Sequence, residues 1–280
     1  MKKWKESCIA FLKSLSGKDL TTHTASITFF LLFSVLPLLI LISLFLPLTG
    51  YGPEELIIFI TGATPDFLDT LVAQVIRETY ARSAGIVPIT VIIVVWSAMQ
   101  AVNALIRGLH MVYEIPKKKN LLIQNLTAAI TVFAISFFLI LSTVGLVLLN
   151  TLFHAVGADR LQFAVLPYVI LNLRYIITFL FLLLLLLLLY TFISGAQRRM
   201  RSHLPGAVLS SVAIAIFTGF FSIYIRYNKH YATIYGSLAT IIIMLLWAYA
   251  CVLIVLLGGC FNHFLILRRA QNGKSDEAVS

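Results

Sequence analysis

Charged residues are scarce in this chain. Asp, Glu, Lys and Arg make up 11% of the 280 residues, whereas soluble proteins carry about 25%. Apolar residues make up 60%, and the mean hydropathy is +0.98. A water-exposed surface with so few charges would carry large apolar patches and aggregate. The class of water-soluble proteins is therefore excluded, and lipid must surround most of the surface.

The motifs of common catalytic and metal sites are also lacking. The sequence contains no HExxH, GxGxxG, GxxxxGK or GxSxG. Its six histidines are scattered near the ends of apolar runs, and Cys8, Cys251 and Cys260 form no CxxC pair. We therefore predict no enzymatic activity, no cofactor and no bound metal.

Long uncharged runs are what the chain has in abundance. A helix needs about 20 apolar residues to cross the hydrocarbon core. We expect an all-α, polytopic membrane protein in three parts: a basic N-terminal segment (1–26), a six-helix transmembrane domain (27–267) and a tail (268–280). The six predicted spans are 27–48, 86–106, 121–153, 161–195, 206–225 and 234–267.

The cations indicate the orientation of these spans. The formal net charge is +10, but Lys and Arg lie almost wholly between the apolar runs, so we expect no nucleic acid partner. With six spans, one side collects 15 of these residues and the other 5. The positive-inside rule then places both termini in the cytoplasm, with basic loops facing anionic lipid headgroups. A homo-oligomer stays an open alternative.

The lengths of the segments predict two further features. Three spans exceed the bilayer thickness, so they project beyond it or break near Pro167 and Gly236. The first outer loop, 49–85, carries five acidic residues, and 64–66 reads as a helix start before apolar residues at helical spacing over 68–79. We expect an amphipathic helix there, which either rests on the bundle or interface or forms a lid over a substrate path.

Polar residues inside the spans are candidates for function. Gln100, Asn103 and Arg107 form a stripe on one helix, which either makes interhelical hydrogen bonds or lines a polar cavity. Arg174 is the one Asp, Glu, Lys or Arg inside an apolar run, and it either snorkels to the outer interface or faces the interior and pairs with an anion or carbonyl groups.

Other spans carry packing signals. Small residues at four-residue steps in the fifth span predict a close helix contact, and Pro37 predicts a kink in the first. Tyrosines around the turn between the fifth and sixth spans either anchor the bundle at the interface or line an entrance. The small residues are Ala207, Ser211, Ala215 and Gly219.

Four stretches resemble the YihY/BrkB family of bacterial inner-membrane proteins, formerly mislabelled ribonuclease BN. They are SVLPLL at 34–39, AVNALI at 101–106, LPGA at 204–207, and the segment 235–258 with YGSLA, LLWAY and LLG. The resemblance implies six helices in the bacterial cytoplasmic membrane, links to serum resistance, and transport, including cation/proton exchange. Where many relatives read Gly-Ala-Glu after the last motif, this chain has Gly259 and Cys260, so a proton-coupling role for that Glu does not carry over. The matching motif residues are Pro37, Asn103, Gly206, Tyr235, Gly236, Ser237, Trp247 and Gly258.

Together these features predict a transporter of a small or lipid-like solute, with or without coupling to an ion. Because no predicted span contains Asp or Glu, an anionic or lipid substrate at Arg174 is at least as well supported as a cation. The alternative is a non-transporting scaffold or envelope-assembly factor. The residues expected along the solute path are Gln100, Asn103, Arg107, Arg174, Tyr235 and Ser237.

Overall fold

The structure is a computed structural model. It describes residues 10–11, 14–15, 17–45, 52–61, 68–80, 87–115, 166–194, 200–227 and 238–277. Over these ranges the regular structure is helical throughout, as expected for an all-α membrane protein. The elements are α2 (Leu20–Phe45), α3 (Pro53–Thr61), α4 (Asp69–Tyr80), α5 (Val87–Val112), α7 (Leu166–Ile193), the 3-10 turn η5 (Met200–Ser202), α8 (Leu204–Tyr227) and α10 (Leu238–Glu277).

Five of the predicted spans coincide with α2, α5, α7, α8 and α10, and the third, 121–153, lies outside the described residues. Segments of α5, α8 and α10 are long and apolar enough to cross a membrane. The fold class is thus confirmed, while the number of six spans stays a prediction. The three crossing segments are Ile92–Val112, Leu204–Tyr227 and Ala239–Arg269.

Helices α7 and α10 begin near Pro167 and Gly236, and because the residues before each helix lie outside the described part, the expected breaks stay predictions. Helix α7 has Pro167 in its first turn, where a missing N–H costs nothing, and α10 begins two residues after Gly236. With 40 residues α10 is about 60 Å long, twice the hydrocarbon thickness, so it projects from the bilayer. Helix α2 continues through Pro37, and the predicted kink there stays a prediction.

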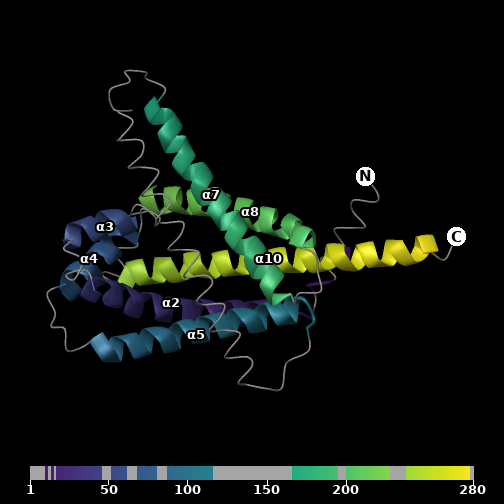
Figure 1. The fold of residues 1–280 in the computed structure, drawn as a ribbon, viewed down its shortest axis with the longest axis horizontal. Coiled ribbons are helices and arrows are strands. Elements are labelled where there is room, and N and C mark those ends of the chain that lie inside the picture. Colours follow the sequence, from purple (N-terminus) through teal and green to yellow (C-terminus); the bar gives the residue numbers. More distant parts are fainter. Residues whose placement is uncertain are drawn as a thin grey trace.

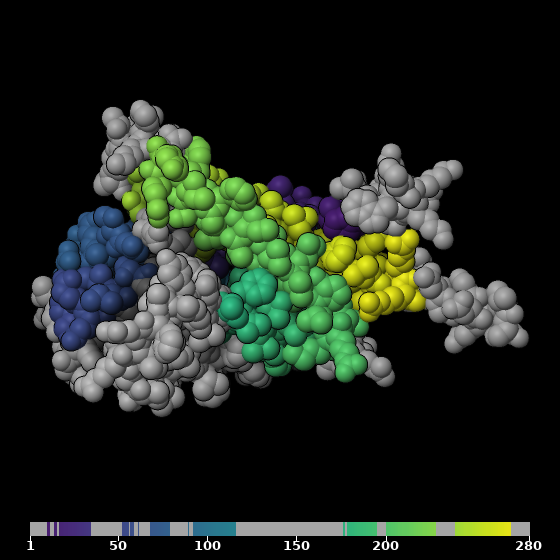
Figure 2. Space-filling view, turned by 90° about the horizontal axis from the view of Figure 1, so that it is seen from above, coloured from purple at the N-terminus to yellow at the C-terminus, as the bar shows by residue number. Residues whose placement is uncertain are grey.

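The helices lie around α10 (Figure 1). Helices α2 and α5 pack together along one side of α10, α8 packs along another, and α7 crosses α8 steeply. Viewed from above, α8 and α7 occupy one face, and α10 extends past them toward the C-terminus (Figure 2). Apolar side chains point outward at many positions, among them Ile92, Trp96, Ile216, Phe220 and Leu246, as a lipid-facing surface requires.

Helices α3 and α4 form a hairpin, here called the cap, at the end of the bundle where α10 begins. The predicted amphipathic helix is confirmed as α4, and its buried Val72 and Ile76 pack in a cluster with Leu32 of α2 and Met244 of α10. The cap therefore rests on the bundle. Helix α3 was not predicted, because its nine residues are too short to show a helical stripe.

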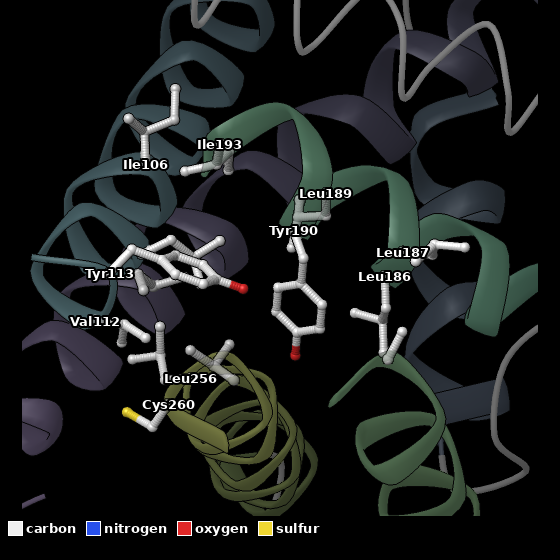
Figure 3. Packing of buried hydrophobic residues seen from close by; sticks show 14 of the residues in the cluster. Ile106, Val112, Tyr113, Leu186, Leu187, Leu189, Tyr190, Ile193, Leu256 and Cys260 are labelled. Atoms are coloured by element: carbon white, nitrogen blue, oxygen red, sulfur yellow. The ribbon is translucent and has the colours of Figure 1, made fainter. Parts of the chain in front are cut away.

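The main apolar core lies between α2, α5, α7, α8 and α10. Figure 3 shows the rings of Tyr113 and Tyr190 pointing into the space above α10, where Leu256 and Cys260 lie. Tyr190 and Leu256 are completely buried. A tyrosine hydroxyl inside such a core must find a hydrogen-bond partner, and the two hydroxyls lead to the polar groups described next.

Candidate functional site

The predicted stripe on α5 turns from the interior to the surface. Asn103 is 5% exposed, Gln100 is half-buried, and Arg107 is exposed. Ser97, on the same helix and completely buried, donates its hydroxyl proton to the carbonyl of Val94 in its own helix. The carboxamide of Asn103 is therefore the buried amide of the predicted stripe, and the stripe leads from it to an exposed cation.

The positions of the other predicted path residues relative to this stripe stay predictions. Arg174 lies in the third turn of α7, and its side chain is outside the described part of the structure. Tyr235 and Ser237, like the motif residue Gly236, lie outside the described residues. Whether Arg174 faces the interior or the interface therefore stays a prediction.

Two motif glycines bring α8 and α10 into close contact. A Cβ added at Gly206 would overlap the carbonyl oxygen of Gly258, and a Cβ at Gly258 would overlap the hydroxyl of Ser210. A Cβ at Gly258 would also lie 2.8 Å from the hydroxyl oxygen of Tyr190. Glycine is therefore required at both positions for the backbones to approach this closely.

The small-residue stripe on α8 is confirmed only in part. Ala207 and Ser211 are buried, but Ala215 and Gly219 are exposed. Nothing lies within 4 Å of a Cβ built on Gly219. Only the first half of the small-residue stripe therefore lies in the α8–α10 contact, and farther along α8 the contact is made by other side chains such as Thr218.

Tyr190 joins three helices through its hydroxyl. The hydroxyl donates to the carbonyl of Val255 in α10 at 2.7 Å and lies 2.9 Å from Ser210 Oγ in α8. Tyr190 itself belongs to α7 and is completely buried. No pattern in the sequence pointed to this residue, since it lies at the end of a leucine-rich run in which every face is apolar.

Asn262 of α10 holds the beginning of α8. Its Oδ1 accepts the N–H of Gly206 at 2.7 Å, and its Nδ2 donates to the carbonyl of His203 at 3.0 Å. The first N–H groups of a helix have no partner within the helix, so this buried amide satisfies one of them. In the sequence Asn262 is visible only as an amide among apolar residues. The N–H that it binds belongs to Gly206, which lies 56 residues away in the chain.

His203, just before α8, connects the ends of two other helices. It is completely buried, with Nδ1 3.3 Å from the hydroxyl of Tyr113 and Nε2 2.9 Å from Ser194 Oγ. Tyr113 follows α5 and Ser194 follows α7. Two of the six histidines that look scattered in the sequence thus meet at Tyr113, because the ring of His263 also packs edge-on against it.

Ionisable groups at this end of the bundle form a second cluster, here called the clasp: Lys18, Glu114 and His263. Lys18 Nζ donates to the carbonyl of Val112 at 2.8 Å and lies 3.3 Å from Glu114 Oε1. His263 Nε2 lies 3.7 Å from the same carboxylate oxygen. The lysine and the histidine are largely buried, while Glu114 is exposed.

The clasp is not a metal site by composition. Among the described residues no group of three or more His, Cys, Asp or Glu could hold a metal ion.

The motif residue Trp247 makes a contact between helices. Its Nε1 donates to Thr218 Oγ1 at 3.1 Å, which joins α10 to α8.

Comparison with known proteins gives a consistent picture. The model of a family described as Virulence factor BrkB matches residues 11–279. A putative ribonuclease-like protein, YfkH of Bacillus subtilis, is 28% identical over 93% of this chain and 97% of its own length. A UPF0761 membrane protein of Aggregatibacter aphrophilus is 24% identical over 92% of this chain and 91% of its own length. A UPF0761 membrane protein of Haemophilus influenzae is 23% identical over 89% of this chain and 91% of its own length. No solved structure matches the chain.

Proposed function

The chain belongs to the Virulence factor BrkB family, and we propose that it is a transporter of a small or lipid-like solute in the bacterial cytoplasmic membrane. In this proposal the clasp end and both termini face the cytoplasm, and the cap faces outward. The excess of cations on one side of the spans supports this orientation. The relatives include bacterial proteins named as membrane proteins, which supports the compartment.

The observation that carries the proposal is the buried amide of Asn103. A carboxamide within a membrane helix makes hydrogen bonds with its neighbours and can also present its polar atoms to a path, which is the role proposed for Asn103. Asn103 is 5% exposed, and the exposed Arg107 follows one turn later on the same helix. A solute path along α5 requires a polar group inside the bundle and a cation where the path reaches the surface. Asn103 and Arg107 would supply these two groups.

The charge of the spans favours an anionic headgroup or another anionic solute. The six predicted spans contain no Asp or Glu, so a carboxylate relay for cations has no residue there. Arg107 is the described cation at the end of the stripe, and Arg174 is a second predicted path residue. Guanidinium groups bind phosphate and carboxylate with two parallel hydrogen bonds.

The test uses the purified full chain in lipid vesicles with three probes. Fluorescently labelled phosphatidylglycerol and phosphatidylethanolamine report lipid movement through quenching by an impermeant reductant. A trapped pH-sensitive dye reports cation/proton exchange. We expect faster movement of the anionic lipid than in protein-free vesicles, and a loss of that acceleration in Asn103→Ala and Arg107→Gln. Ser97→Ala is the matched control, because its hydroxyl bonds only within its own helix in the described contacts.

Each outcome separates the alternatives. If only the pH signal is accelerated, the transported species is an ion and not a lipid-like solute. Wild-type rates in Asn103→Ala would overturn the assignment of the path to α5. No acceleration with any probe by a protein that keeps its helical circular dichroism would overturn transport and favour the scaffold, for which the cap supplies an ordered outer surface.

We do not extend the ribonuclease-like name of the Bacillus relative to this chain. Cleavage of RNA needs a general acid and base or a metal close to the phosphate. The sequence has none of the corresponding motifs, and among the described residues no three His, Cys, Asp or Glu side chains gather in a group that could hold a metal ion. The proposed function is therefore not enzymatic.

A further inference from the structure

Two buried histidines lie at the clasp end of the bundle. Among the residues whose side chains the structure describes, His203 and His263 are the buried groups that change charge near neutral pH, since no Asp, Glu, Lys or Arg there is buried. His203 is completely buried, and His263 is 5% exposed. A buried imidazole can bind a proton if its charged form finds hydrogen-bond partners. The contacts of His203 supply such partners.

Hydroxyl groups face both ring nitrogens of His203. Nδ1 lies 3.3 Å from Tyr113 Oη, and Nε2 lies 2.9 Å from Ser194 Oγ. A neutral imidazole has one donor and one acceptor, whereas an imidazolium has two donors. Because a hydroxyl group can donate or accept, both partners suit either form of the ring. Ser194 Oγ also lies 3.3 Å from the carbonyl oxygen of Thr191, which can take the hydroxyl proton when the ring donates to Oγ.

The backbone of His203 is held on both sides. Its N–H donates to the carbonyl of Met200 at 3.1 Å, and its carbonyl accepts from Asn262 Nδ2 at 3.0 Å and from the N–H of Ala207 at 3.1 Å. Gain or loss of a ring proton therefore requires the rotation of hydroxyl groups and no displacement of the chain. A group that binds and releases protons repeatedly needs such a fixed setting.

Two helix C-termini favour the charged form of His203. Its partner Tyr113 directly follows α5, and its partner Ser194 directly follows α7. The C-terminus of a helix carries a partial negative charge, which attracts an imidazolium. The N-terminus of α8, which begins at Leu204, acts in the opposite direction. Two favourable helix ends thus meet one unfavourable end at this ring.

The other charged groups at this end of the bundle offset one another. Lys18 Nζ lies 3.3 Å from Glu114 Oε1, and Glu114 directly follows Tyr113 in the chain. The protonation of His203 is therefore decided mainly by its two hydroxyl partners and the helix ends. The ionisable residues of the elements around His203 are Lys18 before α2, His110, Tyr113 and Glu114 at the end of α5, Tyr190 in α7, Arg201 in η5, and Cys260 and His263 in α10.

We propose that His203 is a proton-binding site, which takes up and releases one proton at the clasp end of the bundle. In the neutral ring, Nε2 donates to Ser194 and the Tyr113 hydroxyl donates to Nδ1. On uptake, Tyr113 passes its hydroxyl proton to Nδ1 and takes another from water, so the phenol stays neutral and the ring gains one positive charge. Helix α5 carries Asn103 and ends beside Tyr113, so in the transporter this proton is the ion coupled to the solute, a role that rests on the proposed function.

The test follows the protonation of each histidine by nuclear magnetic resonance. The full chain, with ¹⁵N in its histidine rings, is placed in lipid bilayers and examined from pH 8 to pH 5, because the ring nitrogen signals distinguish the neutral and charged forms. His203→Gln and His263→Gln assign the two buried rings. We expect His203 to change from neutral to charged within this range.

Removal of either hydroxyl should weaken proton binding at His203. Tyr113→Phe and Ser194→Ala each remove an acceptor from the imidazolium, and hydrogen bonds to charged groups are stronger than those to neutral groups. We expect a proton affinity about tenfold lower, which moves the midpoint of the titration about one pH unit down. Tyr190→Phe is the matched control, because its hydroxyl bonds to α8 and α10 in the described contacts, and it should leave the midpoint of His203 unchanged.

Two results would overturn the proton site. One is a single charge state of His203 throughout the range from pH 8 to pH 5. The other is a shift of its midpoint in Tyr190→Phe as large as in Tyr113→Phe, which would show a general effect of lost tyrosine hydroxyls. Ser194→Ala carries the same comparison if Tyr113→Phe does not fold.

The coupling is tested separately, in the vesicle assay with labelled phosphatidylglycerol at several pH values. In Tyr113→Phe the pH of half-maximal lipid movement should fall by the same amount as the midpoint of His203. Lipid movement that does not depend on pH would overturn the coupling. A protein that moves no probe while His203 titrates as expected would confirm the proton site and overturn transport, so the two proposals fail separately.

Discussion

Gly258→Ala is expected to destabilise the α8–α10 contact by about 2 kcal/mol, which lowers the ratio of folded to unfolded protein about 30-fold. The added methyl group would overlap Ser210 Oγ and lie 2.8 Å from Tyr190 Oη and 3.0 Å from the carbonyl oxygen of Gly206. Carbon atoms ordinarily keep about 3.5 Å from their packed neighbours. Ser210 must therefore change rotamer, or the two helices must separate.

The magnitude follows from three contributions. Overpacking of a tight core typically costs about 1–3 kcal/mol. Displacement of Ser210 also breaks its 2.9 Å hydrogen bond with Tyr190, and such bonds in membrane proteins contribute about 0.6 kcal/mol. Alanine is up to about 1 kcal/mol better than glycine within a helix, and this gain offsets part of the loss.

The assay is reversible unfolding of the purified protein by titration with dodecyl sulfate in mixed micelles, followed by circular dichroism. Gly219→Ala is the matched control, because it makes the same change on α8 where nothing lies within 4 Å of the new methyl group. It should leave stability unchanged or raise it slightly. Ser210→Ala combined with Gly258→Ala should cost about 1 kcal/mol less than the sum of the single changes, since the overlapping oxygen is gone.

Equal stability of Gly258→Ala and Gly219→Ala would refute the reasoning. It would mean that the two helices do not approach as closely as the backbones indicate. Strict additivity of the Ser210 and Gly258 changes would likewise refute the steric origin of the cost.

Two further perturbations test the contacts around this core. Asn262→Leu should lower the free energy of unfolding by about 1–3 kcal/mol in the same titration, because the N–H of Gly206 and the carbonyl of His203 lose their buried partner. In the cap, the hydrogen bonds from the Arg77 guanidinium lower the pKa of the Glu54 carboxyl below its usual 4.5. The stabilisation of the α3–α4 hairpin should therefore be fully present above about pH 4.5 and be lost as the pH falls through the lowered pKa. Hydrogen exchange of α3 amides, corrected for intrinsic rates, should show this acid loosening, and Glu54→Gln should abolish the pH dependence.

Much of the architecture follows from the sequence because lipid imposes a strong local rule. A helix that crosses hydrocarbon must be apolar over about 20 residues, so five of the predicted spans could be located and coincide with described helices. The same holds for α4, whose two faces differ in polarity because one faces the bundle. Asn103, Gly206 and Gly258 stand out in the sequence as motif residues. In the structure Asn103 is buried, and the two glycines lie where α8 and α10 approach closely.

The contacts that hold the bundle together could not be predicted in this way. Helices α2 and α7 have no face that is clearly more apolar than the other, so periodicity does not show which face points inward when lipid and protein are equally apolar surroundings. The partners are also remote in the chain: Tyr190 is 20 residues from Ser210, and Lys18 is 94 residues from Val112. The sequence by itself determined an all-helical membrane protein, its charge asymmetry and where most described helices lie. Only the tertiary structure decided which buried polar groups meet, because a polar group in a dry interior is stabilised by whichever partner the packing brings within hydrogen-bond distance.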